Sequence, residues 1–240
     1  RGFIMPDWHT FCKDLKSSID EFKKQYDVVK EISDAFGLPS YITFRSTREF
    51  YEQNKEWILD LVKQEGIPAL LELWGDRYYY FVLKFERNVI SSAGKSATLG
   101  TIQIDVESSL DYITQGDKKR EKYNIKFTDE DGVVKHPIIL HNSPSGAIER
   151  VVWGLLESAI RNQDKLIPGF KTWLAPIQVR VLPISEKTLD YAEKLMNELN
   201  NLGYRADLDE RNEKLGKKIR NSEVDWIPFT IIIGEKELKN

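Results

Sequence analysis

The stretch HPIILHNSPSGAIERVVWGLLE, residues 136–157, decides the fold that this sequence predicts. Its apolar residues 138–140 predict a short buried strand. A Ser-Pro-Ser-Gly turn follows at residues 143–146, and an apolar helix then begins. Arg150 therefore lies in the first turn of a helix, beside the turn glycine and near the end of a buried strand. A planar guanidinium in that place can stack on a base and reach a phosphate.

The elements around this stretch predict a first domain of the α+β class. Helical spacing of apolar residues predicts two long helices, over residues 15–36 and 48–64, each followed by a glycine. Alternating or aromatic runs predict strands at residues 40–45, 78–85, 88–92, 101–106 and 138–140. Because strands follow one another with helices outside them, we expect a mainly antiparallel sheet covered by helices. Asp131 and Gly132 predict a hairpin turn.

After residues 168–170 (PGF) the order changes to alternating strands and helices. Strands are expected at residues 177–182, 205–208 and 229–233, the last of them buried throughout, and helices at residues 189–199 and 216–220. This order predicts a small α/β domain. We place the boundary near Lys171, so that residues 1–170 and 171–240 form separate domains.

Composition restricts the classes of function that are compatible with the chain. The formal net charge of −3 argues against a general nucleic-acid coat, so any RNA contact must come from a local basic patch. Cys12 is the only cysteine, which excludes an intrachain disulfide and indicates a reducing compartment. No apolar run reaches the roughly 18 residues that a bilayer crossing needs. We therefore expect a cytoplasmic protein without membrane contact.

Near the N-terminus, Asp7, His9 and Cys12 lie close together in the sequence. His9 and Cys12 are three positions apart, so they would share a face in a helix and supply half of a zinc site. His141, at the end of the strand, can supply a further ligand. The alternative is a buried structural histidine and a small apolar cysteine, and spacing alone favours that alternative.

Polar residues interrupt two of the predicted strands. Lys84 lies in an apolar and aromatic run, and Gln103 and Asp105 point to one face of their strand. Such side chains either line a substrate site or face solvent, as antiparallel sheets allow.

A dense group of basic residues follows in the second domain: Arg211, Lys214, Lys217, Lys218 and Arg220. This group is either a phosphate-binding patch or the solvated face of a helix.

Together, these segments resemble the threonyl-tRNA synthetases, a family of class II aminoacyl-tRNA synthetases, in their archaeal form. RGFIMPDWHTFC (1–12) resembles the end of motif 2, GTIQIDVES (100–108) the strand before motif 3, and ILHNSPSGAIER (139–150) motif 3 itself. Three later segments resemble the anticodon-binding domain that the glycine, histidine, proline and threonine enzymes share: residues 173–185, 206–220 and 226–237.

The resemblance implies the ATP-dependent attachment of threonine to its tRNA. The partners it implies are threonine, ATP with Mg²⁺ as counter-ion, and threonine tRNA, and the intact protein is expected to be a homodimer. His9 and His141 correspond to two zinc ligands of the family, whose third ligand is a cysteine upstream of this chain. Cys12 matches a cysteine that is not a ligand. Asp7 corresponds to the aspartate that recognises the threonine hydroxyl.

Further positions correspond to catalytic and RNA-binding residues of the family. Gln103 matches a glutamine of the threonine pocket, and Lys84 a lysine that faces the reacting carboxylate and phosphate. Arg150 matches the motif 3 arginine that binds ATP. The anticodon surface corresponds to Arg211, Asn212, Lys214, Arg220 and Glu237.

The chain also departs from the family pattern. Motif 1 and most of motif 2 are absent, so residues 1–170 resemble the C-terminal part of a catalytic domain, and the anticodon-binding domain resembles a truncated one. We therefore expect a fragment of a threonine–tRNA ligase that is inactive by itself. The alternative is a tRNA-binding module of a catalytically decayed or editing-associated relative. Retention of residues such as Lys84 and Arg150 favours the enzyme.

Overall fold

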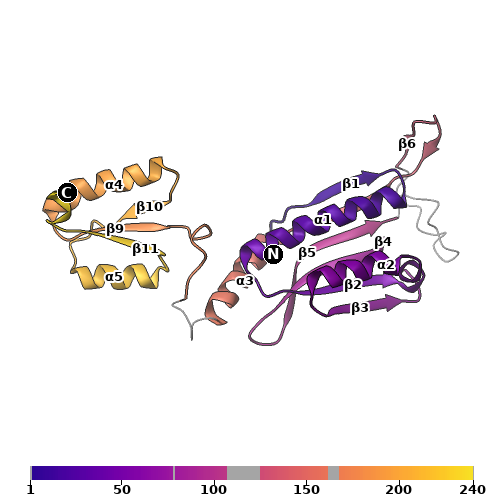
Figure 1. Ribbon diagram of the computed structural model, residues 1–240, viewed down its shortest axis with the longest axis horizontal. Coiled ribbons are helices and arrows are strands. Elements are labelled where there is room, and N and C mark those ends of the chain that lie inside the picture. The colour runs from indigo at the N-terminus through magenta and orange to yellow at the C-terminus, as the bar shows by residue number, and fades with distance from the viewer. Residues whose placement is uncertain (1, 78, 107–124, 162–167, 240) are drawn as a thin grey trace. The chain divides into compact units, whose positions relative to one another are not determined.

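The computed structural model describes residues 2–77, 79–106, 125–161 and 168–239, drawn as ribbon in Figure 1. The chain divides into two compact units, residues 1–158 and 159–240, which we describe separately. The domain boundary near Lys171 stays a prediction. In the described part of the chain, no helix combines the length and the apolar character needed to pass through a bilayer.

The first unit is built on a six-stranded sheet with the strand order β1-β8-β5-β4-β2-β3. The strands are β1 (Trp8–Cys12), β2 (Tyr41–Thr47), β3 (Ala69–Trp74), β4 (Phe81–Ile90), β5 (Ser96–Asp105) and β8 (Ile138–Ser143). Neighbouring strands are antiparallel except for the pair β2 and β3, which confirms the expected mainly antiparallel sheet. The sequence pattern does not predict β3, because its residues ALLELW do not alternate and it lies at the edge of the sheet.

A short hairpin of β6 (Phe127–Thr128) and β7 (Val134–Lys135) extends from this unit. Its turn contains Gly132 with φ +79°, which confirms the predicted turn at Asp131 and Gly132. The aromatic strand begins later than its composition predicts, because β4 starts at Phe81 and Tyr79 lies in a bend before it. Tyr78 and residues 107–124 lie outside the described part of the chain.

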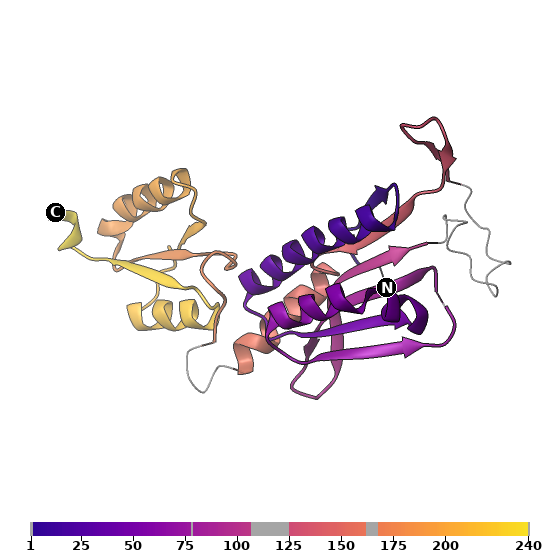
Figure 2. The same ribbon diagram turned by 45° about the vertical axis from the view of Figure 1, so that its right-hand side comes forward.

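Two long helices, α1 (Leu15–Phe36) and α2 (Arg48–Glu65), cover one face of this sheet (Figures 1 and 2). The Asp14 side chain accepts a hydrogen bond from the backbone N–H of Ser17 and caps the start of α1. Gly37 ends α1 and Gly66 ends α2, each in the left-handed conformation that glycine adopts without strain. Both helices match the sequence prediction.

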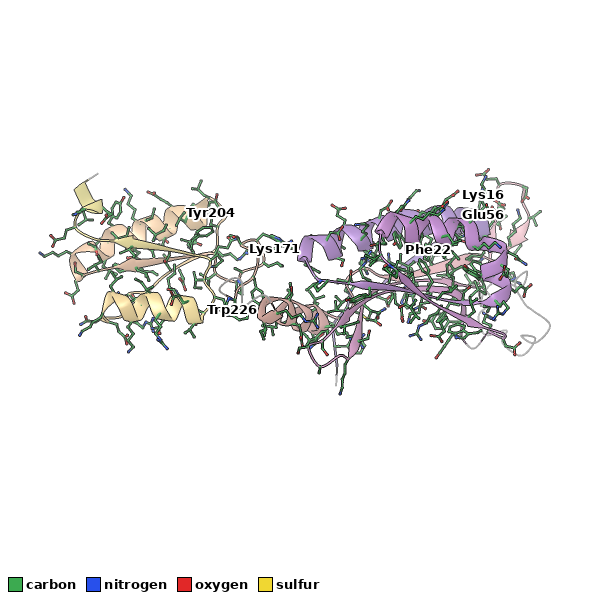
Figure 3. All side chains as sticks on the ribbon, turned by 60° about the horizontal axis from the view of Figure 1, so that its bottom comes forward. Lys16, Phe22, Glu56, Lys171, Tyr204 and Trp226 are labelled. Atoms are coloured by element: carbon green, nitrogen blue, oxygen red, sulfur yellow. The ribbon has the colours of Figure 1, made fainter. Side chains whose placement is uncertain are left out.

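The core lies between these helices and the sheet. Phe44 in β2 pairs with Phe85 in β4, which pairs with Ile102 in β5, and each side chain is at most 1% exposed. Phe22 of α1, which is labelled in Figure 3, packs in the core between the helix and the sheet. The centre of the Tyr26 ring lies 4.7 Å from that of the Phe85 ring. Each such side chain contributes roughly 2 kcal/mol through burial.

The turn before α3 (Ile148–Arg161) is held tightly against β5. Gly146 has a φ of +71°, and a Cβ atom built there would lie 2.1 Å from the carbonyl oxygen of Leu99. No side chain fits into that space. The turn predicted at residues 143–146 is therefore confirmed, and its glycine allows the start of α3 to approach the sheet.

The second unit has a three-stranded parallel sheet with the order β10-β9-β11. Its strands are β9 (Val179–Pro183), β10 (Ala206–Leu208) and β11 (Phe229–Ile233), and its helices are α4 (Leu189–Asn201) and α5 (Leu215–Val224), with single 3₁₀ turns at η2 (Glu186–Thr188) and η3 (Glu237–Lys239). Figure 1 shows α4 and α5 on opposite faces of this sheet. The predicted small α/β unit is confirmed.

One strand of this unit is less buried than its sequence predicts. The apolar run of β11 suggests burial throughout, but Phe229 is 56% exposed and Ile232 is 37% exposed. Ile233 is 3% exposed and packs in the core of the unit. The reason is topological: β11 is an edge strand and has β9 as its one neighbour in the sheet.

Lys218 corrects the interpretation of the basic cluster. It is 4% exposed, and its Nζ donates hydrogen bonds to the carbonyl oxygens of Pro183, at 3.0 Å, and Asp209, at 2.9 Å. A buried ammonium group with these partners joins α5 to the end of β9. Lys218 is therefore a structural residue and does not belong to a phosphate-binding surface.

The close approach at Gly146 can be tested by substitution. Gly146→Ala should lower the free energy of unfolding by about 3 kcal/mol or more, because left-handed strain and a steric clash act together. Gly94→Ala is the matched control: Gly94 has a φ of +72° but no atom within 4 Å of a built Cβ. That control should cost about 1 kcal/mol in urea denaturation followed by circular dichroism. Equal losses would show that the contact with Leu99 does not constrain the fold.

The buried lysine gives a second stability prediction. Lys218→Met should destabilise the second unit by about 2 kcal/mol, because two buried carbonyl groups lose their donor. Lys217→Met is the control, since Lys217 is exposed and pairs with Glu213 on the helix surface. Amide hydrogen exchange in β9 and α5 measures the local effect. Unchanged exchange in Lys218→Met would contradict the structural role of this lysine.

Candidate active site

A row of polar side chains crosses the face of the sheet opposite to α1 and α2. His9 in β1 pairs with His141 in β8, His141 with Gln103 in β5, and Gln103 with Lys84 in β4. Arg45 in β2 pairs with Lys84 and extends the row. Directly paired residues point to the same face of a sheet. Strand pairing therefore brings together residues that are distant in the sequence.

At one end of this row, Asp7, His9 and His141 form a cluster of possible metal ligands. Each residue offers one ligand atom, and these atoms lie within 4.8 Å of one another. The two imidazole rings are stacked with their centroids 4.4 Å apart, and the Nε2 atom of His141 lies 2.5 Å from Oδ1 of Asp7. Two imidazole nitrogens and a carboxylate oxygen fit zinc, which takes such donors. The structure thus brings together the residues that the sequence predicts here.

Cys12 is not part of this cluster. His9 and Cys12 lie in a strand, where residues three apart point to opposite faces, and not in a helix, where they would share one. The Cys12 side chain is 6% exposed and packs in the apolar core. Burial, together with Glu21 and Asp14, raises the pKa of its thiol to about 11. The HxxC spacing is therefore not a ligand pair.

A pocket of about 390 Å³ lies over the polar row. It is lined by residues from the sheet, from the segment before β1 and from the start of α3, among them Asp7, Lys84, Gln103, His141, Gly146 and Arg150. Ser143 holds the segment before β1 in place, because its Oγ donates a 2.7 Å hydrogen bond to the carbonyl oxygen of Pro6. The N–H of Ile148 donates likewise to the carbonyl oxygen of Ile4, at 2.9 Å.

Gln103 has unused hydrogen-bonding capacity at this pocket. It is 6% exposed, and its Oε1 atom has no hydrogen-bond partner among the described residues. Buried polar atoms in native structures are nearly always paired, and a bound ligand is one way to satisfy such an atom. Gln103 is therefore suited to accept a hydrogen bond from a molecule in the pocket.

Lys84 lines the pocket beside a residue that is not among the candidates from the sequence. The Nζ atom of Lys84 lies 2.9 Å from Oε1 of Glu86, and Glu86 also lines the pocket. The side chain of Glu86 is 6% exposed. The sequence does contain a signal that could identify Glu86: side chains alternate along a strand, so residues 84 and 86 lie on one face.

Arg150 occupies the predicted place in the first turn of α3. Its Nη1 donates a 2.9 Å hydrogen bond to the carbonyl oxygen of Thr98, and the side chain is exposed at the pocket. Lys84 and Arg150 therefore bring two positive groups to one cavity from different elements, and charge-assisted hydrogen bonds from such groups favour an anionic ligand.

In the second unit, the predicted anticodon residues lie at the surface. Arg211 donates two hydrogen bonds to the carboxylate of Asp209, which hold the pKa of Asp209 below its usual value. Glu237 is exposed, and its Oε2 accepts a 2.9 Å hydrogen bond from the N–H of Gly234. The other predicted residues are also exposed: Asn212, Lys214 and Arg220. Lys214 precedes α5 directly as its N-cap.

Comparisons with known proteins identify relatives of the whole chain and a family match for part of its second unit. Residues 178–240 match the family model described as an anticodon binding domain. The threonine–tRNA ligase of Thermococcus kodakarensis is 44% identical over 99% of this chain, and that of Nitrosopumilus maritimus is 42% identical over 99%. In both cases the chain spans 37% of the relative's length.

A solved structure supports the fold. The crystal structure of the RNA binding domain of threonyl-tRNA synthetase from Cryptosporidium parvum superposes with a TM-score of 0.73 at 24% sequence identity. The match covers 99% of this chain and 56% of that one. The chain is therefore similar over 99% of its length to threonine–tRNA ligases, of which it spans 37%, and its residues 178–240 match the anticodon binding domain family.

Proposed function

We propose that this chain is the C-terminal part of a threonine–tRNA ligase, which attaches threonine to its tRNA at the expense of ATP. The observation that carries the proposal is the polar row. Strand pairing places His9, His141, Gln103 and Lys84 side by side on one face, and the pocket over them also reaches Arg150. A decayed relative would have no reason to retain this complete arrangement.

Threonine would bind at the end of the row formed by the two histidines. His9 and His141 would hold a zinc ion, which, when bound, takes the amino group and the hydroxyl group of the amino acid as ligands. Asp7, beside His141, is placed to accept the hydroxyl proton in a hydrogen bond. Gln103 offers its unpaired Oε1 to the same ligand. Valine lacks the hydroxyl group and would leave these polar groups unsatisfied, which is a strong basis for rejection.

Activation of threonine would take place between Lys84 and Arg150. A carboxylate oxygen of threonine forms a bond to the α-phosphorus of ATP, and the bond from that phosphorus to the leaving pyrophosphate breaks. Both the attacking carboxylate and the phosphates are negative. Lys84 and Arg150 would stabilise the charge that accumulates in the transition state, with Mg²⁺ as the counter-ion of ATP.

The second unit would recognise the tRNA anticodon. Its family match supports RNA binding, and Lys214 and Arg220 lie exposed on or beside α5. The hydrogen bond from Gly234 holds one oxygen of Glu237 and leaves the other free to accept from a base. We also propose that the intact protein is a cytoplasmic homodimer, as the resemblance to this family implies.

Substitutions in the pocket test the activation step in the complete gene product that contains this chain. Lys84→Ala and Arg150→Ala should each lower the rate of threonine-dependent ATP–pyrophosphate exchange by about 100-fold, because each removes one positive group from the transition state. Lys95→Ala, in an exposed turn, is the control and should leave the rate unchanged. A wild-type protein that binds tRNA without any exchange would favour the catalytically decayed alternative.

The metal assignment can be tested by elemental analysis of the same protein. We expect about one zinc ion per wild-type chain. His9→Ala and His141→Ala should remove most of the zinc, because each loses one ligand. Cys12→Ala is the control and should retain the zinc, since Cys12 points into the core on the other face of the sheet. Loss of zinc in Cys12→Ala with retention in His141→Ala would contradict the assignment.

Substitutions in the second unit can distinguish a contact with an anticodon base from contacts with tRNA phosphates. Glu237→Gln keeps the shape and the hydrogen bond from Gly234 but removes the charge, so it should reduce the preference for threonine tRNA over an anticodon variant about ten-fold. Lys217→Ala should weaken binding to both tRNAs equally and reduce the salt dependence. Filter-binding titrations at several salt concentrations measure both effects. The division of roles is wrong if Lys217→Ala changes the preference and Glu237→Gln does not.

A further inference from the structure

Four charged side chains of alternating sign form a continuous chain on the pocket face of the sheet: Glu72, Arg45, Glu86 and Lys84. Oε2 of Glu72 lies 3.6 Å from Nη1 of Arg45, and Nε of Arg45 lies 3.2 Å from Oε2 of Glu86. The other carboxylate oxygen of Glu86, Oε1, lies 2.9 Å from Nζ of Lys84. Glu86 thus places one oxygen against each of two cations.

Burial along this chain is greatest at Glu86. The exposed fraction of the side chain is 43% for Glu72, 37% for Arg45 and 22% for Lys84, but 6% for Glu86. An ionised carboxylate at that depth is costly unless it is paired, and loss of one partner leaves the other charge uncompensated. Removal of one partner from the pair of Glu86 and Lys84 should therefore cost more than the same change at a surface ion pair.

The flexibility of the Lys84 side chain explains why an ion-pair partner is needed to fix its position. A lysine side chain has four rotatable carbon bonds, and fixing it in one conformation costs up to about 2 kcal/mol. Here the Nζ atom has Glu86 on one side and lies 5.8 Å from the centre of the Phe81 ring. An ammonium group has three donors, so the ion pair with Glu86 leaves donors for oxygen atoms of a ligand in the pocket.

We propose that Glu86 is a positioning residue, which holds the ammonium group of Lys84 towards the reacting carboxylate and phosphate. This role rests on the proposed function and deepens it. In this role Glu86 acts through Lys84. Arg45 lies against the second oxygen of Glu86 and offsets its charge.

A double-mutant cycle on ATP–pyrophosphate exchange tests the role in the complete gene product. Glu86→Gln should lower kcat about ten-fold with little change in the KM for threonine, because a misplaced catalytic group affects the transition state. In a Lys84→Ala background the same change should cause no further loss. Additive losses would overturn the proposal, since a purely structural glutamate would act independently of Lys84.

A control substitution and a check of folding make the change in kcat specific to the pair of Glu86 and Lys84. Glu72→Gln is the matched control, because it makes the same chemical change on the same face without touching Lys84, and it should leave kcat unchanged. Circular dichroism must show that Glu86→Gln is folded. If that variant unfolds, Glu86→Asp replaces it, and this variant should retain the charge and recover part of kcat through Lys84.

A measurement without catalysis separates this inference from the proposed function. In competitive acetylation followed by mass spectrometry, Glu86→Gln should increase the labelling of Lys84 several-fold relative to that of Lys95 within the same chain. Unchanged labelling would show that Glu86 does not hold Lys84. Absence of exchange in the wild-type protein, with labelling that responds to Glu86→Gln, would instead refute the ligase and leave the pairing established.

Discussion

The register of β4, β5 and β8 is the constraint on which the rest of the first unit depends. Side chains alternate between the two faces of a strand, so one register determines both what is buried and what lines the pocket. Phe85 and Ile102 pair on the covered face, while Lys84 and Gln103 pair on the other. A slip of one residue would place the polar pair in the core.

Contacts on the covered face fix this register, and the same register determines which side chains line the pocket. Tyr26 of α1 packs on Phe85 of β4, and Phe22 lies in the same core against Trp57 of α2, where a polar residue would lack partners. Within β5, the carbonyl oxygen of Leu99 lies where a side chain at position 146 would begin. The start of α3, and Arg150 with it, is thus held against the sheet by the same strand that carries Gln103.

Much of this arrangement follows from local signals in the sequence. Gly37 and Gly66 mark the ends of the long helices, and the period of two places Lys84 and Gln103 among residues of the polar face. The HxxC alternative depends on local conformation: Cys12 would share a face with His9 in a helix but does not in a strand. The apolar role of Cys12, which the spacing favours, is confirmed by its place in the core. Lys218 could not be interpreted locally, because one carbonyl group that binds it belongs to Pro183, 35 residues away.

The two positive side chains of the pocket differ in burial and in partners, which the sequence motifs do not reveal. Lys84 and Arg150 both interrupt apolar segments, and in the sequence they look equivalent. In the structure, Lys84 is bound to a buried carboxylate and mostly buried itself, whereas Arg150 is exposed and donates to a backbone carbonyl group. An ion-paired group in a rigid sheet has a fixed position, and a long exposed guanidinium can adjust to its ligand. The pocket therefore combines one preorganised positive group with one adaptable group.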